Sequence, residues 1–324
     1  MFGQPITHAH IQAQVGLARS WPRLLAAWRL YGQQARAGCA HFKTTDMLVM
    51  LPMGRMKNTT SHISIDKKQN LNNQLTTSWL QRKLRLARLL LHVLYGLVVA
   101  IILLPRVDDR RRQRIIRHWS GKMLAALDIH VVVSGRPPDP EISGALFVAN
   151  HVSWVDIQAI HSVLAVRFVA KSEIRDWPVF GPLAARANTL FIERTRRHDA
   201  GRIVEMVAAR LHVGDCICFF PEGTTSDGSA VQPFKSSLMQ AAIDAQIPVR
   251  PIAIRYPAAD GSLNKQMAYY GEMSLWQSIK RVLAQRAPMA ELHFLPPIAT
   301  AGLDRHEVSL RARQAISQAL AIVH

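Results

Sequence analysis

The sequence predicts an α/β protein in which a mostly parallel central sheet is flanked by helices and preceded by N-terminal membrane-associated helices. Two observations support this prediction. After residue 126, short apolar runs of strand length alternate with longer amphipathic stretches, which is typical of buried parallel strands joined by helices. Before that point lies one apolar run long enough to match the hydrocarbon thickness of a bilayer.

The chain of 324 residues divides by composition into three regions. Residues 1–75 are mixed and polar without sustained periodicity, and we expect a poorly ordered extension and linker there. Translation could also begin at Met56 within this region. Residues 76–125 are expected to form a membrane-associated helical region. Residues 126–324 are about one domain's worth of chain, and we expect them to form the α/β domain.

The membrane signal is the run Leu86–Leu104, LARLLLHVLYGLVVAIILL. Nineteen helical residues span roughly 28 Å, about one hydrocarbon thickness. Only Arg88 and His92 are strongly polar, and both lie near one end, while basic residues flank both sides. This pattern fits a segment held at an anionic membrane face that dips into the bilayer or crosses it. The alternative is a buried core helix.

In the third region the apolar runs predict seven strands and the amphipathic stretches predict four helices. Asp304, followed three residues later by Glu307, resembles a capping box at the start of the last helix. The expected strands are Ile129–Val133, Ala145–Ala149, Arg167–Ala170, Thr189–Ile192, Cys216–Phe220, Val249–Ile254 and Glu291–Phe294. The expected helices lie near 154–165, 198–212, 234–245 and 304–322.

Charge and cysteine content limit the class of protein. Lys and Arg total 40 against 22 acidic residues, a net charge of +18, which implies a polyanionic partner such as nucleic acid, an anionic membrane face or an acidic protein. Three cysteines, Cys39, Cys216 and Cys218, cannot form a disulfide framework. The last two alternate within an apolar run and are expected to be buried thiols in a reducing compartment. No cysteine–histidine spacing predicts a metal site.

The first candidate motif, Asn150–Asp156, follows an apolar strand and precedes a helical pattern. An α/β sheet presents functional groups at this position, the carboxyl end of a strand. His151 and Asp156 would point about 140° apart on one straight helix, so they meet only if His151 lies in the turn and Asp156 in the first helical winding. The carboxylate would then hold one ring nitrogen and leave the other basic. Read alone, the pair could also be unrelated surface groups.

Three further motifs lie at strand ends or strand starts. In Phe220–Thr225, Gly223 permits a positive φ, and exposed N–H groups together with Thr224 could hold an anion. In the run FIER, Arg194 ends a strand and could bind a phosphate through two hydrogen bonds. The run IPVRPI is punctuated by proline, and its expected role is structural or substrate-lining.

The order NHVSWVD, FIER, FPEGT and IPVRPI resembles the glycerolipid acyltransferase family, typified by 1-acylglycerol-3-phosphate acyltransferases. The resemblance covers about Ile129–Ile254 and the helical region before it. It implies that His151 is the catalytic base and that Asp156 orients it, in an HX4D motif. The further residues that the resemblance assigns to substrate binding are Arg194, Glu222, Gly223, Thr224, Lys171 and Pro251.

The chain departs from the family pattern at two positions. Asn188 stands where a glycine usually opens the second motif, and asparagine tolerates left-handed backbone better than most residues. Thr225 stands where relatives that act on lysophosphatidic acid commonly carry arginine. Loss of an arginine from a phosphate site removes a charge-assisted hydrogen bond, so a different head group becomes a serious alternative.

The resemblance implies transfer of an acyl chain from acyl-CoA or acyl carrier protein to the free hydroxyl of a lysolipid, with no cofactor. The first acceptor is 1-acylglycerol-3-phosphate, giving phosphatidic acid, and the alternative is a lyso-ornithine lipid. The implied location is the inner membrane of a bacterium, with the catalytic domain facing the cytoplasm. A nucleic-acid-binding protein would rest on charge alone, without a reader motif, so no nucleic acid is expected as a partner. A catalytically idle scaffold of the same fold is a third alternative.

Overall fold

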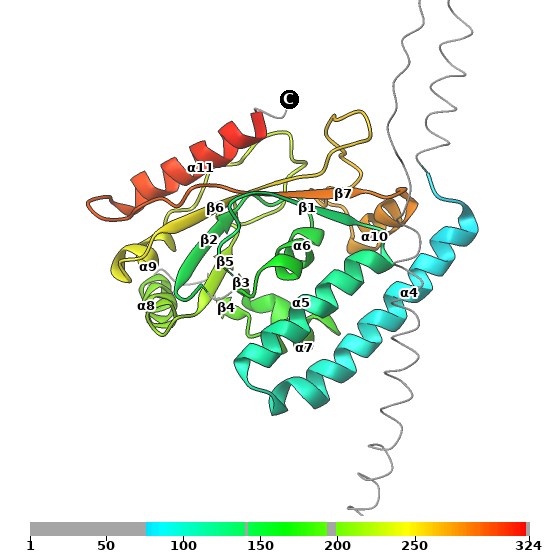
Figure 1. The fold of residues 1–324 in the computed structure, drawn as a ribbon, viewed down its shortest axis with the longest axis horizontal. Helices are drawn as coiled ribbons and strands as arrows, with labels where there is room; N and C mark the ends of the chain where they lie inside the picture. The colour runs from blue at the N-terminus through cyan, green and yellow to red at the C-terminus, as the bar shows by residue number, and fades with distance from the viewer. Residues whose placement is uncertain (1–75, 140–141, 193–198, 322–324) are drawn as a thin grey trace, which may run out of the picture. The chain divides into compact units, whose positions relative to one another are not determined.

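The structure is a computed structural model that describes residues 76–139, 142–192 and 199–321. The expected N-terminal extension, with Met56 and Cys39, therefore lies outside the described residues, as does Arg194. Figure 1 shows a central sheet with helices on both of its faces.

The sheet contains the seven strands that the sequence predicts. Their order is β1-β7-β6-β2-β5-β3-β4, and each neighbouring pair is parallel except the antiparallel pair β6–β7. The expected mostly parallel sheet is thus confirmed. The strands are β1 (His130–Gly135), β2 (Ala145–Ala149), β3 (Arg167–Lys171), β4 (Leu190–Ile192), β5 (Cys216–Phe219), β6 (Val249–Arg255) and β7 (Met289–Phe294).

The central strand β2 is buried on both faces because its residues alternate between two cores. Phe147 packs with α5 (Asp109–Ala126), α6 (Val155–Val163) and α10 (Leu275–Ala284) on one face. Leu146 and Val148 pack on the opposite face with α8 (Asp199–His212), α9 (Met239–Asp244) and α11 (Arg305–Ala321). A strand covered on both sides needs apolar residues throughout, which is why ALFVA reads as a continuous apolar run.

All four helices expected in the α/β domain are present, and the side chain of Asp304 caps the last one. Asp304 accepts hydrogen bonds from the N–H groups of His306 and Glu307, at 2.7 and 2.9 Å. Two helices were not predicted: α10, and the short α7 (Phe180–Arg186), which follows the 3₁₀ turn Ser172–Asp176. The sulfur atoms of Cys216 and Cys218 are free and buried.

The apolar N-terminal segment forms α4 (Trp79–Val98), which continues through the π turn Val99–Leu103 into the 3₁₀ turn Leu104–Arg106. Among the described residues, the stretch Trp79–Arg106 is long and apolar enough to cross a membrane by length and composition. It is not a buried core helix, because large apolar side chains on α4 stay exposed, with Leu91 at 68 %.

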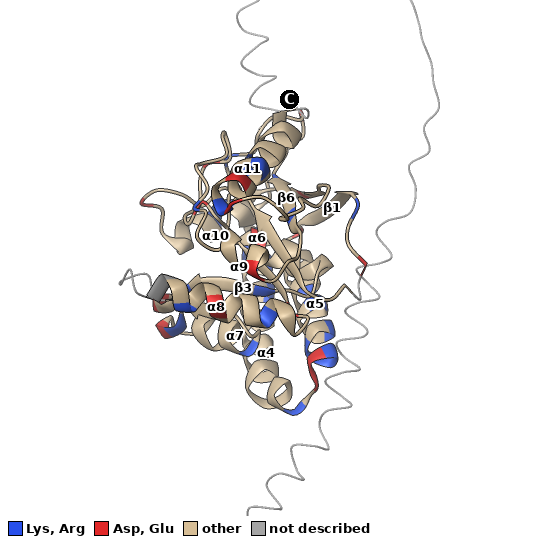
Figure 2. Ribbon diagram, turned by 90° about the vertical axis from the view of Figure 1, so that its left-hand side faces the viewer, with Lys and Arg blue, Asp and Glu red and all other residues tan. Residues whose placement is uncertain are grey.

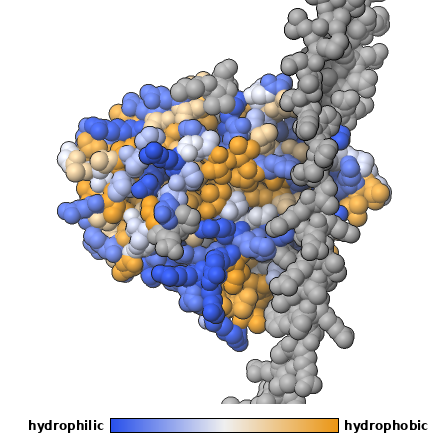
Figure 3. Space-filling view, in the orientation of Figure 1, coloured by the Kyte–Doolittle hydropathy of each residue, from blue (hydrophilic) through white to orange (hydrophobic). Residues whose placement is uncertain are grey.

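Charged and apolar surface lie side by side around α4 and α5. Figure 2 shows basic residues gathered on α5, whose first turns carry four consecutive or near-consecutive arginines in the run RRRQR. In Figure 3 the lower part of the face, over α4 and α5, presents hydrophobic surface directly beside hydrophilic surface. This combination is typical of helices that lie at a membrane interface.

Helices α4 and α5 are joined by a close contact at Trp119. Its indole packs against Gly96, where a Cβ atom would collide with the ring. The indole Nε1 donates to the carbonyl of His92 at 3.3 Å, and the Nε2 atom of His92 bonds to the carbonyl of Trp119 at 2.9 Å. Farther along α5, Ser120 donates to Gln158 of α6 at 2.9 Å. The helical hairpin is therefore fixed to the helix that follows the first motif.

Candidate active site

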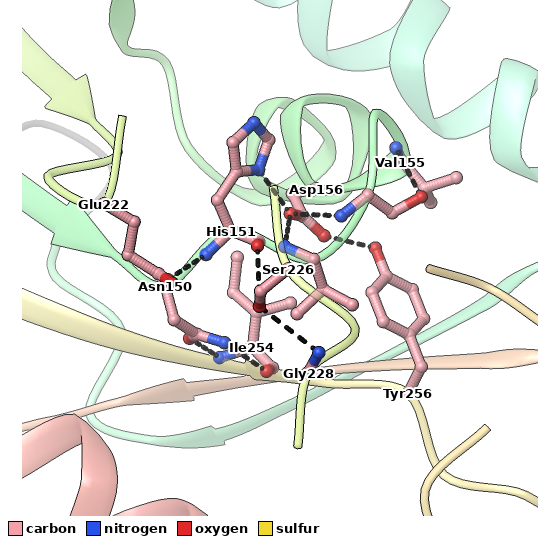
Figure 4. Close-up of polar contacts among 11 residues, drawn as sticks. Asn150, His151, Val155, Asp156, Glu222, Ser226, Gly228, Ile254 and Tyr256 are labelled. Carbon is pink, nitrogen blue, oxygen red and sulfur yellow. Dashed lines mark hydrogen bonds and ion pairs between the residues drawn. The ribbon is translucent and has the colours of Figure 1, made fainter. Parts of the chain in front are cut away.

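His151 lies in the turn between β2 and α6, and Asp156 lies in the first winding of α6. The imidazole Nδ1 and the carboxylate Oδ2 are 2.7 Å apart. The spacing predicted that the two side chains would meet only with His151 in the turn and Asp156 in the first winding, and the structure shows this arrangement. Figure 4 shows the second ring nitrogen of His151 pointing away from Asp156. Because a carboxylate accepts, Nδ1 carries the proton and Nε2 is left as a base.

The carboxylate of Asp156 is fully buried and surrounded by donors. Its Oδ2 atom accepts from the N–H groups of Val152 and Ser153, at 2.8 and 2.9 Å, in addition to the imidazole. Its Oδ1 atom accepts from the hydroxyl of Tyr256 at 2.5 Å. Hydrogen bonds from several donors satisfy a carboxylate that would otherwise be costly to bury. The charge that orients His151 is therefore itself held in place on both oxygens.

Tyr256 is the part of this site that the sequence did not reveal. It follows β6, 100 residues after Asp156, and is fully buried. Burial, together with the charge of Asp156, raises the pKa of Tyr256 well above its usual value. The phenol therefore remains a donor at physiological pH. A lone tyrosine after an apolar strand carries no sequence signal of such a contact.

Glu222 braces the motif that contains His151. Its Oε1 atom accepts from the backbone N–H of His151 at 2.7 Å, and its Oε2 atom accepts from the N–H of Gln232 at 3.1 Å. Burial raises the pKa of Glu222, and the two backbone hydrogen bonds oppose this effect. Ser226 adds a backbone hydrogen bond to the carbonyl of His151 at 2.9 Å. The first and third motifs therefore meet at the main chain of His151.

Two backbone expectations are confirmed. Gly223 has a φ of 75° and Asn188 a φ of 60°. Both values fall in the left-handed region, which glycine enters freely and asparagine tolerates. Asn188 thus adopts the conformation expected for the glycine that it replaces.

A series of aromatic rings packs beside the imidazole of His151. The imidazole of His151 stacks on Phe220 with 3.8 Å between ring centroids, and Phe220 stacks on Phe168 at 5.7 Å. The next ring is His161, edge-on to Phe168 at 4.8 Å. The stacking on Phe220 and the hydrogen bond to Asp156 together fix the orientation of the His151 ring.

A cavity of about 290 Å³ opens beside His151. Its walls come from α4, α5, α6 and α7 and from the strand ends, and they are mostly apolar, with Trp119, Trp154 and Phe180 among the large side chains. Thr225 also lines the cavity. A base at the wall of an apolar cavity is suited to a substrate with a hydrocarbon chain.

Of the residues expected to bind substrate, none that the structure describes lines the cavity. Lys171 is exposed at the end of β3, and Thr224 is exposed beside the third motif; neither lines the cavity. Pro251 is buried within β6 opposite Val148, where it packs in the sheet and does not line the cavity. Substrate binding by these residues, by Gly223 and by Arg194, which lies outside the described residues, stays a prediction.

Within the part of the chain that the structure describes, no three His, Cys, Asp or Glu side chains come together as a possible metal site. The site is built instead from one imidazole, one buried carboxylate and an apolar cavity. An imidazole held in this way can act as a general base, and the apolar cavity can accept a hydrocarbon chain.

Comparison with known proteins places the chain in a family. The family model described as Acyltransferase matches residues 130–255. The lyso-ornithine lipid O-acyltransferase of Pseudomonas aeruginosa is 39% identical over 243 residues, which are 73% of this chain and 92% of that protein. The chain belongs to this acyltransferase family.

Two further comparisons are informative. The 1-acyl-sn-glycerol-3-phosphate acyltransferase of Neisseria meningitidis serogroup B is 38% identical over 184 residues, 57% of this chain and 71% of that protein. The crystal structure of the 1-acyl-sn-glycerophosphate acyltransferase from Thermotoga maritima matches with a TM-score of 0.53 at 22% identity, covering 74% of this chain and 97% of that one. At this identity the structural match supports the fold alone.

Proposed function

We propose that this acyltransferase moves an acyl chain from a thioester donor to the free hydroxyl of a lysolipid, with His151 as the general base. The observation that carries the proposal is the His151–Asp156 pair, 2.7 Å apart, with His151 at the wall of the apolar cavity. General-base catalysis of this kind contributes typically 10²–10⁴ in rate.

The chemistry follows from the tautomer. Nε2 of His151 accepts the proton of the acceptor hydroxyl while the oxygen attacks the thioester carbonyl. The tetrahedral intermediate collapses, the carbon–sulfur bond breaks, and the imidazolium returns its proton to the leaving thiolate. Asp156 stabilises the imidazolium during this step. A thioester is already activated, so the step as written needs no metal and no covalent intermediate on the enzyme.

We place the acyl chain of the donor in the cavity. Its volume of about 290 Å³ is near the lower end for ligand sites, and its apolar lining matches a hydrocarbon chain. Acyl-CoA and acyl carrier protein are both anionic donors, and the net charge of +18 favours the capture of either one.

For the acceptor, we favour a lyso-ornithine lipid over 1-acylglycerol-3-phosphate. Thr225 follows the third motif at the position where an arginine would be expected for a phosphate head group, and ornithine carries no phosphate. The Pseudomonas relative, which matches over 92% of its own length, bears the ornithine lipid name. The phosphate lipid remains the second candidate because the Neisseria relative bears that name at nearly the same identity.

We propose further that α4 and α5 hold the enzyme at the cytoplasmic face of a bacterial inner membrane. The exposed apolar side chains of α4 and the arginines of α5 would meet the acyl region and the anionic head groups, respectively. Residues of both helices line the cavity, so this placement lets acyl chains enter the cavity from the bilayer.

Acyl transfer by the purified full chain in lipid–detergent micelles tests the proposal, with both lysolipids offered beside acyl-CoA and acyl carrier protein. We expect faster acylation of the lyso-ornithine lipid. In Thr225→Arg the specificity constant for the phosphate lipid should rise about tenfold or more, the worth of one charge-assisted hydrogen bond. Thr224→Arg, with the same charge at an exposed neighbour, is the matched control. If the enzyme acylates neither of the two lysolipids, the proposal is wrong.

A further inference from the structure

Two polar side chains interrupt the apolar lining of the cavity beside α6. Gln158 and His161 both line it. They lie three residues apart on α6, so they are neighbours on one face of the helix. We call Gln158 and His161 the polar pair. Neither takes part in the acyl-transfer step proposed above.

The polar pair offers one donor and one acceptor. The Oε1 atom of Gln158 already accepts from Ser120 at 2.9 Å, and no partner is found for its amide N–H groups among the described residues. The Nε2 atom of His161 lies 3.2 Å from the carbonyl of Val166. Because a carbonyl only accepts, Nε2 carries the proton and Nδ1 is left as an acceptor. Burial lowers the pKa of His161 to about 4, so the ring is neutral at physiological pH.

Unused hydrogen-bonding groups at the wall of an apolar cavity favour a ligand that offers a polar partner. His161 is only 6 % exposed and Gln158 is half-buried, and a hydrogen bond is stronger in such surroundings than in bulk water. A donor beside an acceptor is complementary to a group that both accepts and donates. A hydroxyl does both, whereas a carbonyl, ester or ether oxygen can only accept.

Gln158 and His161 lie two and five residues after Asp156 on α6, which is roughly 3 and 7.5 Å farther along the helix axis. Phe220 and Phe168 stand between the rings of His151 and His161, with successive ring contacts of 3.8, 5.7 and 4.8 Å between centroids. An acyl chain whose thioester carbonyl is at His151 would therefore pass several carbon atoms before it reaches His161.

We propose that the polar pair recognises a hydroxyl group on the acyl chain of the donor. The amide N–H of Gln158 donates to the hydroxyl oxygen, and the hydroxyl proton is donated to Nδ1 of His161. The enzyme would then prefer a chain hydroxylated several carbons from the thioester over a plain chain of the same length. The inference rests on the proposed function, because it places the donor chain in this cavity.

A series of acyl-CoA donors tests this, with equal chain length and a hydroxyl that moves carbon by carbon away from the thioester. For one position we expect a specificity constant roughly tenfold above that of the plain chain, which corresponds to two hydrogen bonds of ordinary net strength. Gln158→Met and His161→Phe should each remove most of this preference while the plain chain is still transferred. Ile157→Leu, an apolar change on the same helix and cavity wall, is the matched control and should keep it.

Two results would overturn the inference. In one, no hydroxyl position is preferred by the unmodified enzyme, and a water molecule is the partner of the polar pair. In the other, the variants slow plain and hydroxylated chains equally, and the pair only supports the wall. If the enzyme transfers no chain at all, displacement of a bound fluorescent fatty acid by hydroxylated and plain fatty acids still measures the preference. Failure of the proposed function is thereby distinguished from failure of this inference.

Discussion

The backbone N–H of His151 donates to Oε1 of Glu222 at 2.7 Å, although 71 residues separate the two in the chain. This contact joins the end of β2 to the end of β5, which are neighbouring parallel strands. The second carboxylate oxygen accepts from Gln232. Both oxygens of Glu222 therefore hold main chain, and the geometry favours positioning of the base as the role of this residue.

Glu222→Gln should lower kcat and weaken the fold, because the amide group presents N–H to one of the two backbone N–H groups. Loss of a hydrogen bond to a charged group costs about 1.5–3 kcal/mol. Thermal unfolding and steady-state kinetics measure both effects. Glu173→Gln is the control, since Glu173 is exposed and its carboxylate bonds only to the adjacent Ser172 within the described chain. If the two variants have the same kcat and the same thermal stability, Glu222 does not position His151.

Tyr256→Phe should reduce kcat about tenfold and leave KM for the donor nearly unchanged. The variant keeps the ring in the core but deletes the hydroxyl that donates to Oδ1 of Asp156 at 2.5 Å. A buried acceptor left without its donor costs about 1–3 kcal/mol, and here the acceptor is the carboxylate that orients the base. A rise in KM at constant kcat would instead assign Tyr256 to substrate binding.

Gly96→Ala should destabilise the protein by about 1–3 kcal/mol, as overpacking typically does. The added methyl group would collide with the indole of Trp119 and separate α4 from α5. Gly121→Ala on α5 is the matched control, because a Cβ atom there meets open space; it should stabilise the helix slightly. Thermal unfolding of the two variants in the same detergent gives the comparison. Equal stability of both would contradict the packing described here.

His161 should make the fold sensitive to acid. Burial lowers its pKa from 6.5 to about 4 in the folded state, so the unfolded chain binds a proton more readily than the folded one between these values. The free energy of unfolding therefore falls as the pH drops from about 6.5 toward 4. The loss that His161 causes is up to the order of 3 kcal/mol. Unfolding free energies measured across this range should fall less steeply in His161→Phe than in the unmodified protein.

The strands were predictable because each is a short apolar run, such as ALFVA, that a sheet covered on both faces requires. The short helix α7 was not, because it contains Gly181 and Pro182, which normally interrupt helices. It begins after Val179, whose φ of 70° is uncommon for a β-branched residue and is not predictable from the local sequence.

In the site, too, the contact between residues close in sequence was predictable and the contact between distant residues was not. His151 and Asp156 are close in sequence, and the strand before them and the helix after them dictate how they meet. Tyr256 reaches Asp156 from 100 residues away, and only the pairing of β6 with β2 brings it there. Contacts of that kind depend on the register of the sheet, which a single sequence does not specify.

Acyl transfer by the His151→Ala variant tests the central claim most directly. The variant should bind membranes and unfold at nearly the same temperature as the unmodified enzyme, because the imidazole lies at the cavity and its backbone contacts remain. Its kcat toward the lyso-ornithine lipid should fall by about 10²–10⁴, the typical contribution of a general base. Full acyl transfer by a folded, membrane-bound His151→Ala protein would contradict the account.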